Sequence, residues 1–223
     1  MKVDLFSEPT LWLVGGFPFT RTMLTSALMS ALMLVAGHLI SRAVSNAPAG
    51  RMAALGRISY RFLTDLVTQA AGQPVPGLEV FGGTLFIFIA GASLLGQLPG
   101  VSAPTSNLAA ASALATLVLV AVPYAGIRKL GVRGYLRHYL RPNPILFPLH
   151  IISELSRTLA LSLRLFGNMM SGHLIVALLV ALVGVVVPVP LMALDLLIGL
   201  LQAYIFTILA CVYVGAAARE GEQ

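Results

Sequence analysis

The sequence predicts an all-α integral membrane protein, on the basis of its composition, its long uncharged runs and the placement of its basic residues. Of the 223 residues, 58% are hydrophobic and only 10% are charged. A soluble domain carries about 25% charged residues, so this chain lacks the charge to cover a surface that faces water. We therefore expect residues 1–223 to form a single membrane-embedded domain.

About five membrane-spanning helices follow from the apolar runs, because a helix that crosses about 30 Å of hydrocarbon needs about 20 mostly apolar residues. Prolines and a glycine separate the second span from the third and the fourth from the fifth, at Pro99, Gly100 and Pro104 and at Pro188 and Pro190. The predicted spans cover residues 22–41, 80–98, 108–127, 149–187 and 191–218.

The first and fourth spans each leave an alternative open. The first is longer than the apolar region of about 7–15 residues in a signal peptide, and no basic segment precedes it. We expect it to be retained, with cleavage near Ala47 and Ala49 as the alternative. The fourth would be roughly 58 Å long, which predicts a strong tilt in the membrane. If it stands upright instead, Arg164 lies roughly 35 Å from Val187 and snorkels at the inner interface.

The basic residues predict the orientation. Ten Lys and Arg residues lie between the first and second spans, between the third and fourth, or after the last, and two lie on the opposite side. Basic residues favour the cytoplasm, so the N-terminus should lie outside and the C-terminus in the cytoplasm of a bacterial inner membrane. This bias also explains the net charge of +6. The sequence lacks the basic stripe, interleaved with aromatic residues, that would indicate nucleic-acid binding.

An amphipathic helix is expected on the cytoplasmic side, between the first two spans. Charged residues recur every four positions there, and apolar residues cluster on the other side: Arg57, Arg61 and Asp65 against Leu55, Phe62 and Leu66. This pattern is typical of a helix that lies in the membrane interface. A helix merely solvated in the cytoplasm is the alternative.

The last two spans carry polar residues that have no obvious place in a membrane. A charge at the centre of the bilayer costs roughly 2.5–3.5 kcal/mol on insertion scales. The candidates on these spans are His150, Glu154, Arg157, Arg164, Asn168, His173, Asp195 and Gln202.

Helical spacing of about 100° per residue groups these candidates. His150, Glu154 and Arg157 share one side of the fourth helix, and Arg164 shares a side with Asn168. On the last helix, Asp195 and Gln202 face one direction. The pattern therefore predicts two pairs between helices, His173 with Asp195 and Asn168 with Gln202. Such pairs suit a relay through the bundle, and they also suit a hydrogen-bonded core without a transport role.

Small residues follow Arg164 at Gly167, Ser171 and Gly172. Small side chains allow another helix to approach closely. The approaching helix is either a neighbour within this chain or a helix of a partner protein.

Four segments resemble one known protein family. The central segment is SELSRTLALSLRLFGNMMSGHLI at residues 153–175, and its Arg-Leu-Phe-Gly-Asn run is highly specific. The last helix, LLQAYIFTILACVYV at residues 200–214, resembles the final helix of the family. The segments FPFTRTML at residues 17–24 and LLGQLPGVSAPTSN at residues 94–107 match as well. The family that these segments resemble is F-type ATP synthase subunit a, and the resemblance covers nearly the whole chain in order.

The resemblance implies a role for each candidate. Arg164 falls on the essential arginine that faces the rotor ring, where it meets the carboxylate of each ring subunit in turn. Gly167, Ser171 and Gly172 fall on the face that packs against the rotor. The other positions align with two half-channels: Asn168, His173, Asp195 and Gln202 line the outward one, and His150 and Glu154 lie near the inward one.

Some positions depart from the family pattern. His173 and Asp195 stand where Glu and His are common in bacteria, which resembles an exchanged pair. His150 stands where a carboxylate is usual, so Glu154 is expected to take that role. Asn107 and Ala109 stand where Asp and Asn are frequent. These departures indicate a divergent branch or second copy and leave the outward route open.

The resemblance implies a stator channel subunit that catalyses nothing alone and uses no cofactor or metal. Its implied partners are the c-ring, the peripheral-stalk b subunits, the other subunits of the complex and membrane lipid. Protons are the expected ion because His173 and Asp195 titrate, and sodium is the alternative. A stand-alone secondary transporter would show repeated halves, which are absent from the sequence, and a structural anchor would leave the charged residues of the spans unexplained.

Overall fold

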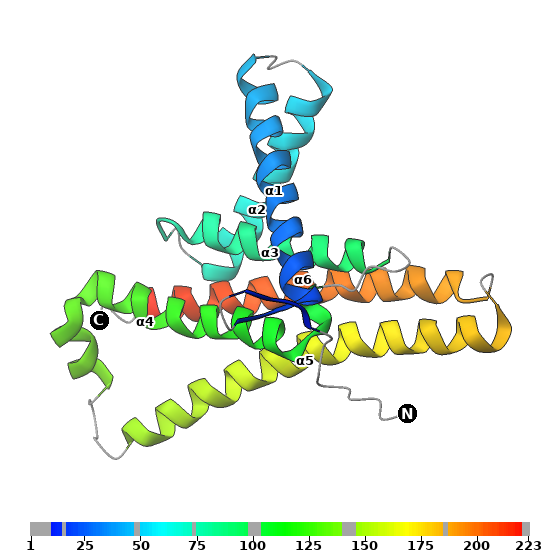
Figure 1. The fold of residues 1–223 in the computed structure, drawn as a ribbon. Coiled ribbons are helices and arrows are strands. Elements are labelled where there is room, and N and C mark those ends of the chain that lie inside the picture. Colours follow the sequence, from blue (N-terminus) through cyan, green and yellow to red (C-terminus); the bar gives the residue numbers. More distant parts are fainter. Residues whose placement is uncertain are drawn as a thin grey trace.

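The computed structural model describes residues 10–14, 17–46, 50–72, 75–97, 104–139, 146–184 and 187–219, without the side chains of residues 10–14, 17–22, 104, 129, 130, 132, 133, 135–139, 146–148, 150 and 219. The described residues form helices and one β-hairpin (Figure 1). In chain order the elements are β1 (Thr10–Val14), β2 (Phe17–Thr20), α1 (Arg21–Asn46), α2 (Arg51–Ala71), α3 (Leu78–Gly96), the 3-10 helix η1 (Pro104–Ser106), α4 (Leu108–Tyr139), α5 (Leu146–Val183) and α6 (Val189–Arg219).

Five helices of the described chain are long and apolar enough to cross a membrane, which confirms the predicted all-α membrane fold. They are α1, α3, α4, α5 and α6, and their apolar stretches are Met23–Asn46, Leu78–Gly96, Leu108–Arg128, Ile151–Val183 and Val189–Ala218. The hairpin of β1 and β2 was not predicted; it is antiparallel, with Trp12 opposite Phe19. The predicted turn at Pro99 and Gly100 lies outside the described residues.

Small residues set the register between α3 and α6, which pack antiparallel. Near the start of α3, a Cβ added to Gly82 would lie 2.7 Å from the sulfur of Cys211. Near its end, Ser93 faces Gly199, where an added Cβ would lie 2.6 Å from the serine Oγ. The helices therefore approach more closely than larger side chains would allow. This register brings the last turn of α3 beside the first turns of α6.

The main buried cluster lies where α3, α4, α5 and α6 meet. Ile89 of α3, Leu165 of α5 and Phe206 of α6 are each 0% exposed. The buried positions of α5 recur every four residues at Leu161, Leu165 and Met169, as expected for one side of a helix packed on a bundle. Between these positions lie two of the polar candidates: Arg164, which is exposed, and Asn168, which bonds to Gln202 of α6.

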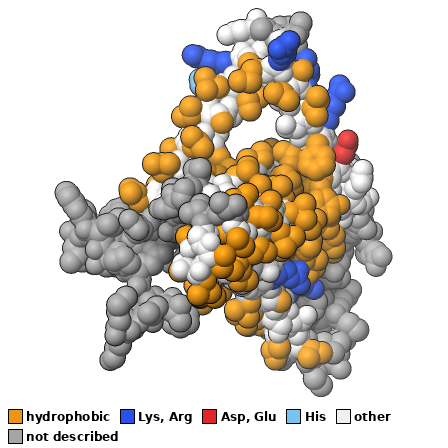
Figure 2. All heavy atoms as spheres, turned by 90° about the vertical axis from the view of Figure 1, so that its right-hand side faces the viewer, with side chains coloured by type: hydrophobic (Ala, Val, Ile, Leu, Met, Phe, Trp, Pro, Cys, Tyr) orange, Lys and Arg blue, Asp and Glu red, His pale blue; other side chains and the backbone are white. Residues whose placement is uncertain are grey.

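The predicted amphipathic helix is confirmed as α2, which turns back along α1 and ends against α6. A Cβ added to Gly215 of α6 would lie 2.9 Å from the backbone of Ala71, so only a glycine fits at this contact. Leu66 is buried, whereas Leu55 and Phe62 are exposed. The hairpin of α1 and α2 projects from the other helices (Figure 1). Basic side chains gather over this hairpin, above a face that is mostly apolar (Figure 2).

The predicted length of the fourth span is confirmed, since α5 has 38 residues. Its first half runs at an angle to α4 and α6, and its second half runs along α6 (Figure 1). The preceding helix α4 is kinked at Gly131, whose φ of 71° lies in the left-handed region that glycine adopts readily. The kink follows directly after the apolar stretch of α4, so the basic end of the helix leaves in a new direction.

Candidate functional site

The end of α3 contacts titratable groups of both α5 and α6. The side-chain amide of Gln97 donates a hydrogen bond from Nε2 to Oδ2 of Asp195, at 3.0 Å. Nε2 of His173 lies 3.1 Å from the carbonyl oxygen of Gly96. Because a carbonyl oxygen only accepts, this contact requires a hydrogen on Nε2 of the imidazole. Gln97, His173 and Asp195 form what we call the Asp195 cluster.

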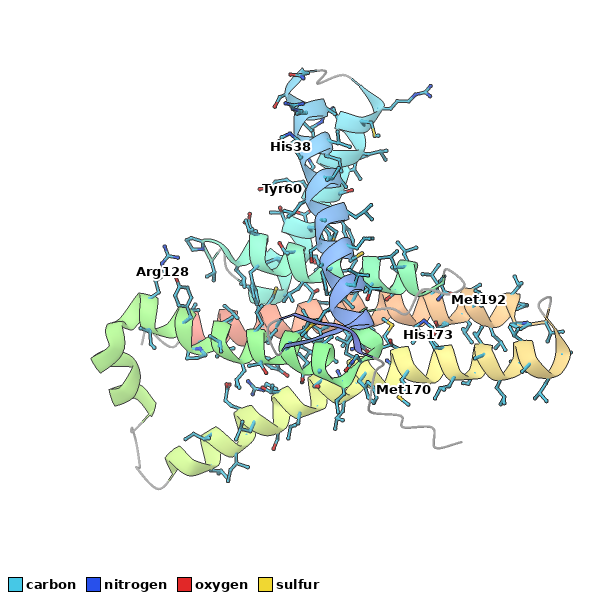
Figure 3. All side chains as sticks on the ribbon, viewed as in Figure 1. His38, Tyr60, Arg128, Met170, His173 and Met192 are labelled. Carbon is cyan, nitrogen blue, oxygen red and sulfur yellow. The ribbon has the colours of Figure 1, made fainter. Side chains whose placement is uncertain are left out.

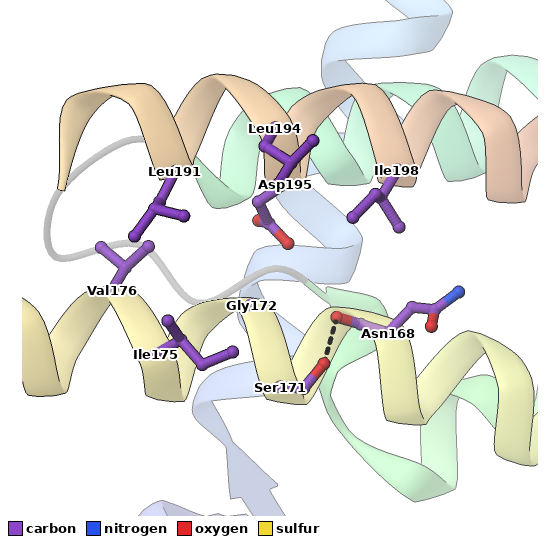
Figure 4. A pocket seen from close by; sticks show the side chains of 9 residues that line it. All are labelled: Asn168, Ser171, Gly172, Ile175, Val176, Leu191, Leu194, Asp195 and Ile198. Atoms are coloured by element: carbon purple, nitrogen blue, oxygen red, sulfur yellow. Dashed lines mark hydrogen bonds between the residues drawn. The ribbon is translucent and has the colours of Figure 1, made fainter.

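A pocket of about 120 Å³ opens beside Asp195, between α5 and α6 (Figure 4). Aliphatic side chains of both helices form most of its walls, and its polar members are Asn168, Ser171 and Asp195. A water molecule takes about 30 Å³ in the liquid, so the pocket has room for several. The pocket thus gives small polar species access to the carboxylate of Asp195.

Gly172 makes room for this carboxylate. Asp195 points from α6 toward Gly172 on α5 (Figure 4), and a Cβ added to Gly172 would collide with both carboxylate oxygens. The structure therefore places Gly172 at an internal contact between α5 and α6. His173, the next residue, lies between the same two helices (Figure 3).

A neutral pair joins α5 and α6 farther along the bundle. Asn168 donates from Nδ2 to Oε1 of Gln202 at 2.9 Å, as the helical spacing predicted. Gln202 is only 2% exposed, and its Nε2 has no partner within the described part of the chain. Ser93 lies near this level and contacts the sulfur of Met169 at 3.9 Å. Polar groups of three helices therefore continue from the Asp195 cluster toward the middle of α5.

Arg164 lies on the outer surface of α5, one turn from Asn168. Its side chain is exposed, and it forms no hydrogen bond or ion pair with any residue that the structure describes. The surface next to it is open: Gly167 is exposed, and a Cβ added there would meet nothing within 4 Å. Ser171, one turn farther on, is also exposed and bonds only to the carbonyl of Asn168.

A second charged group lies on the other side of Arg164, toward the start of α5. Nη1 of Arg157 is 3.3 Å from Oε1 of Glu154, and the two side chains are 38% and 17% exposed. The guanidinium also lies over the ring of Tyr213 on α6, 3.8 Å from its centroid. Glu154, Arg157 and Tyr213 form what we call the Arg157 group. A cation over an aromatic face contributes roughly 0.5–2 kcal/mol, so this group ties α5 to α6.

Comparison with known proteins decides the family. The sequence model of the ATP synthase A chain matches residues 23–215. The chain belongs to the ATP synthase A chain family. It is 44% identical to "ATP synthase subunit a 2" of Bradyrhizobium sp. over 97% of each chain. It is 40% identical to "ATP synthase subunit a" of Albidiferax ferrireducens over 95% of this chain and 92% of that one. A protein of Picosynechococcus sp., also named "ATP synthase subunit a 2", is 50% identical over 74% of this chain and 69% of its own.

Membership of the A chain family makes this chain a multi-pass membrane subunit of the F-type ATP synthase membrane sector, as the resemblance indicated. Within this A chain, the predicted pair of Asn168 and Gln202 is confirmed. His173 and Asp195 do not bond to each other; they contact neighbouring residues at the end of α3. The side chain of His150 lies outside the described residues.

Two residues of this A chain site were missed from the sequence, Gln97 and Tyr213. Gln97 sits at the end of an uncharged span, and a lone amide there gives a weak signal. Tyr213 is one of three aromatic residues in the apolar helix α6. In each of these contacts the two residues come from different helices, so no spacing along one helix relates them. Among the described residues, no three His, Cys, Asp or Glu side chains converge as a metal site would require.

Proposed function

We propose that the chain is the stator subunit that passes protons between the membrane surfaces and the c-ring of a rotary ATP synthase. The observation that carries the proposal is Arg164, an exposed and unpaired arginine on an apolar helix. A charge on such a helix is unfavourable by a few kcal/mol, and no described side chain compensates it. An acidic partner supplied by another subunit would compensate it, which fits a ring of carboxylates moving past α5.

Arginine suits this position because it stays protonated at any biological pH. A nearby cation favours the ionised form of a carboxylate, so a ring subunit gives up its proton as it passes Arg164. The fixed positive charge also repels a cation that would otherwise leak directly past the ring. The open surface at Gly167 and Ser171 leaves space for a ring helix to approach.

Polar groups on the two sides of Arg164 support two separate half-channels. On one side lie two residues of α5 and two of α6, which we assign to the outward half-channel: Asn168, His173, Asp195 and Gln202. The pocket beside Asp195 supplies the space that such a route needs. Toward the start of α5, we assign Glu154 and His150 to the inward half-channel.

The same proposal covers topology and partners. The N-terminus lies outside and the C-terminus in the cytoplasm of a bacterial inner membrane, in keeping with the basic residues of the loops. The c-ring and the peripheral-stalk b subunits are the proposed neighbours, with lipid covering the remaining apolar surface. The chain acts as one membrane-embedded domain and is itself non-catalytic. The alternative is the same role with sodium ions, because His173 and Asp195 favour protons without defining the ion.

The test uses vesicles that contain the whole complex, with ATP added outside and the internal pH followed with and without sodium. Arg164→Ala should lower the rate of coupled transport by at least about a hundredfold, while the complex remains assembled. Arg61→Ala, which removes an exposed arginine of α2, is the matched control and should transport normally. Unchanged transport in Arg164→Ala would overturn the proposal. Transport that requires sodium would assign sodium instead of protons.

A further inference from the structure

Gln97 follows the last turn of α3, and its hydrogen bond to Asp195 was not predicted from the sequence. Its backbone N–H still bonds to the carbonyl of Leu94 at 3.2 Å, with helical angles of φ −77° and ψ −13°. The side chain therefore starts from a fixed helical backbone. α3 itself is held against α6 by the contact of Ser93 with Gly199. Gln97 thus follows directly on a helix that is packed closely against α6.

We propose that Gln97 is a positioning residue of the outward route: its amide holds the carboxylate of Asp195 in the orientation that exchanges protons with the pocket between α5 and α6. The inference rests on the proposed function. The amide donates to Oδ2 at 3.0 Å, while the carboxylate as a whole lies against Gly172. One oxygen is therefore held by a hydrogen bond, and the glycine leaves the space in which the carboxylate fits.

The neutral character of this donor matters for proton exchange. Asp195 forms no ion pair with any cation among the described residues, whereas Glu154 pairs with Arg157. A cationic partner stabilises the ionised carboxylate strongly, and a neutral amide does so only weakly. Gln97 therefore fixes the geometry of Asp195 and still lets the group take up a proton. A permanent ion pair at this position would oppose uptake.

Among the side chains that the structure describes, one other titratable group lies near Asp195. From α5, His173 lies beside Gly172 and contacts the carbonyl of Gly96. From α3, the facing group is Gln97, which does not titrate. On α6, the next charged residue after Asp195 is Arg219, at the far end of the helix. Neighbouring residues of α3 thus contact the carboxylate and the imidazole, which places both groups at one point of the bundle.

The experiment compares Gln97→Leu with Gln69→Leu in vesicles that contain the whole complex. The two variants make the same chemical change, but Gln69 is exposed on α2. ATP-driven acidification is measured from pH 5.5 to pH 9 in steps of roughly half a unit, so that the rate is known on both sides of neutral pH. We expect Gln97→Leu to pump about tenfold more slowly than wild type at neutral pH. Its pH profile should also differ from that of Gln69→Leu, because the carboxylate without its donor no longer meets the pocket in one fixed orientation.

The variant Gln97→Glu keeps the size of the side chain and covers the case in which Gln97→Leu does not assemble. A protonated glutamic acid still donates to Asp195, and an ionised one repels it. Pumping should therefore be close to wild type at low pH and fall steeply as the pH rises. A profile that matches wild type in either assembled variant would overturn the inference and leave Gln97 as a packing residue.

The controls separate this inference from the proposed function. If Arg164→Ala loses coupled transport while both Gln97 variants behave like Gln69→Leu, only the role of Gln97 fails. If Arg164→Ala retains coupled transport, the proposed function fails, whatever the Gln97 variants do.

Discussion

The two arginines of α5 lie two turns apart and have opposite surroundings. Arg157 pairs with Glu154 on its own helix and stacks on Tyr213 of α6. Arg164 is exposed and contacts no acidic or aromatic side chain in the part of the chain that the structure describes. Both residues carry the same charge on the same apolar helix, so the difference comes entirely from their neighbours.

The comparison teaches how a membrane protein keeps charges for different purposes. The charge of Arg157 is compensated within the chain, and removing it would leave a partly buried carboxylate without a partner. The charge of Arg164 is not compensated within the chain, and removing it would break no described contact. We therefore expect Arg157 variants to change stability and Arg164 variants to change transport.

The largest expected effect is on transport in Arg164→Lys, compared with Arg157→Lys. A lysine keeps the charge but is compact, strongly hydrated and able to lose its proton when desolvated. We expect Arg164→Lys to lower ATP-driven acidification by at least about tenfold, and Arg157→Lys to lower it by less than about threefold. The two rates are measured in vesicles with equal amounts of complex. Equal rates in both variants would remove the distinction between the arginines.

An intermediate effect is expected in Arg157→Ala. This variant should lower the free energy of unfolding by about 1–2 kcal/mol, because it removes a partly exposed ion pair and a cation–π contact. The measurement is the denaturation midpoint of the assembled complex in increasing detergent. The double variant Glu154→Gln/Arg157→Met leaves no unpaired charge and should recover most of the loss. Arg164→Ala serves as the comparison and should change the free energy of unfolding by less than about 0.5 kcal/mol. A larger shift in Arg164→Ala than in Arg157→Ala would reverse the assignment.

The smallest effect is expected from the neutral pair next to Arg164. A double-mutant cycle of Asn168→Leu and Gln202→Leu should give a coupling energy of about 0.6 kcal/mol, the average for hydrogen bonds between membrane helices. The same detergent denaturation measures it. A coupling energy above that of the Arg157 group would show that the bundle near Arg164 depends on this pair for its stability.

The spans and the contacts between helices at regular spacing were predictable from the sequence. Uncharged runs located the five apolar helices, and a four-residue spacing placed Asn168 opposite Gln202. The hairpin of β1 and β2 was missed, although Gly15 and Gly16 stand between two runs rich in aromatic and aliphatic residues, a signal for such hairpins. The strands have only five and four residues, so a search for apolar runs of about 20 residues does not detect them.

The contacts of Gln97 and Tyr213 were not predictable, because they depend on the register between separate helices. That register is set by close approaches such as Ser93 with Gly199, which involve only small side chains. A shift of α3 by one turn would move Gln97 about 5.4 Å along α6 and out of reach of Asp195. Hydrophobic periodicity identifies the faces of two helices but does not fix how they slide against each other.

The antiparallel packing of α3 on α6 has a consequence for biosynthesis. A ribosome makes α3 early and α6 last, so Gln97 has no carboxylate to bind until residue 195 has entered the membrane. Asn168 likewise waits for Gln202. A nascent or truncated chain that stops before α6 lacks the helix that joins α2, α3, α4 and α5. The polar path is therefore completed only after α6 has entered the membrane and packed against α3 and α5.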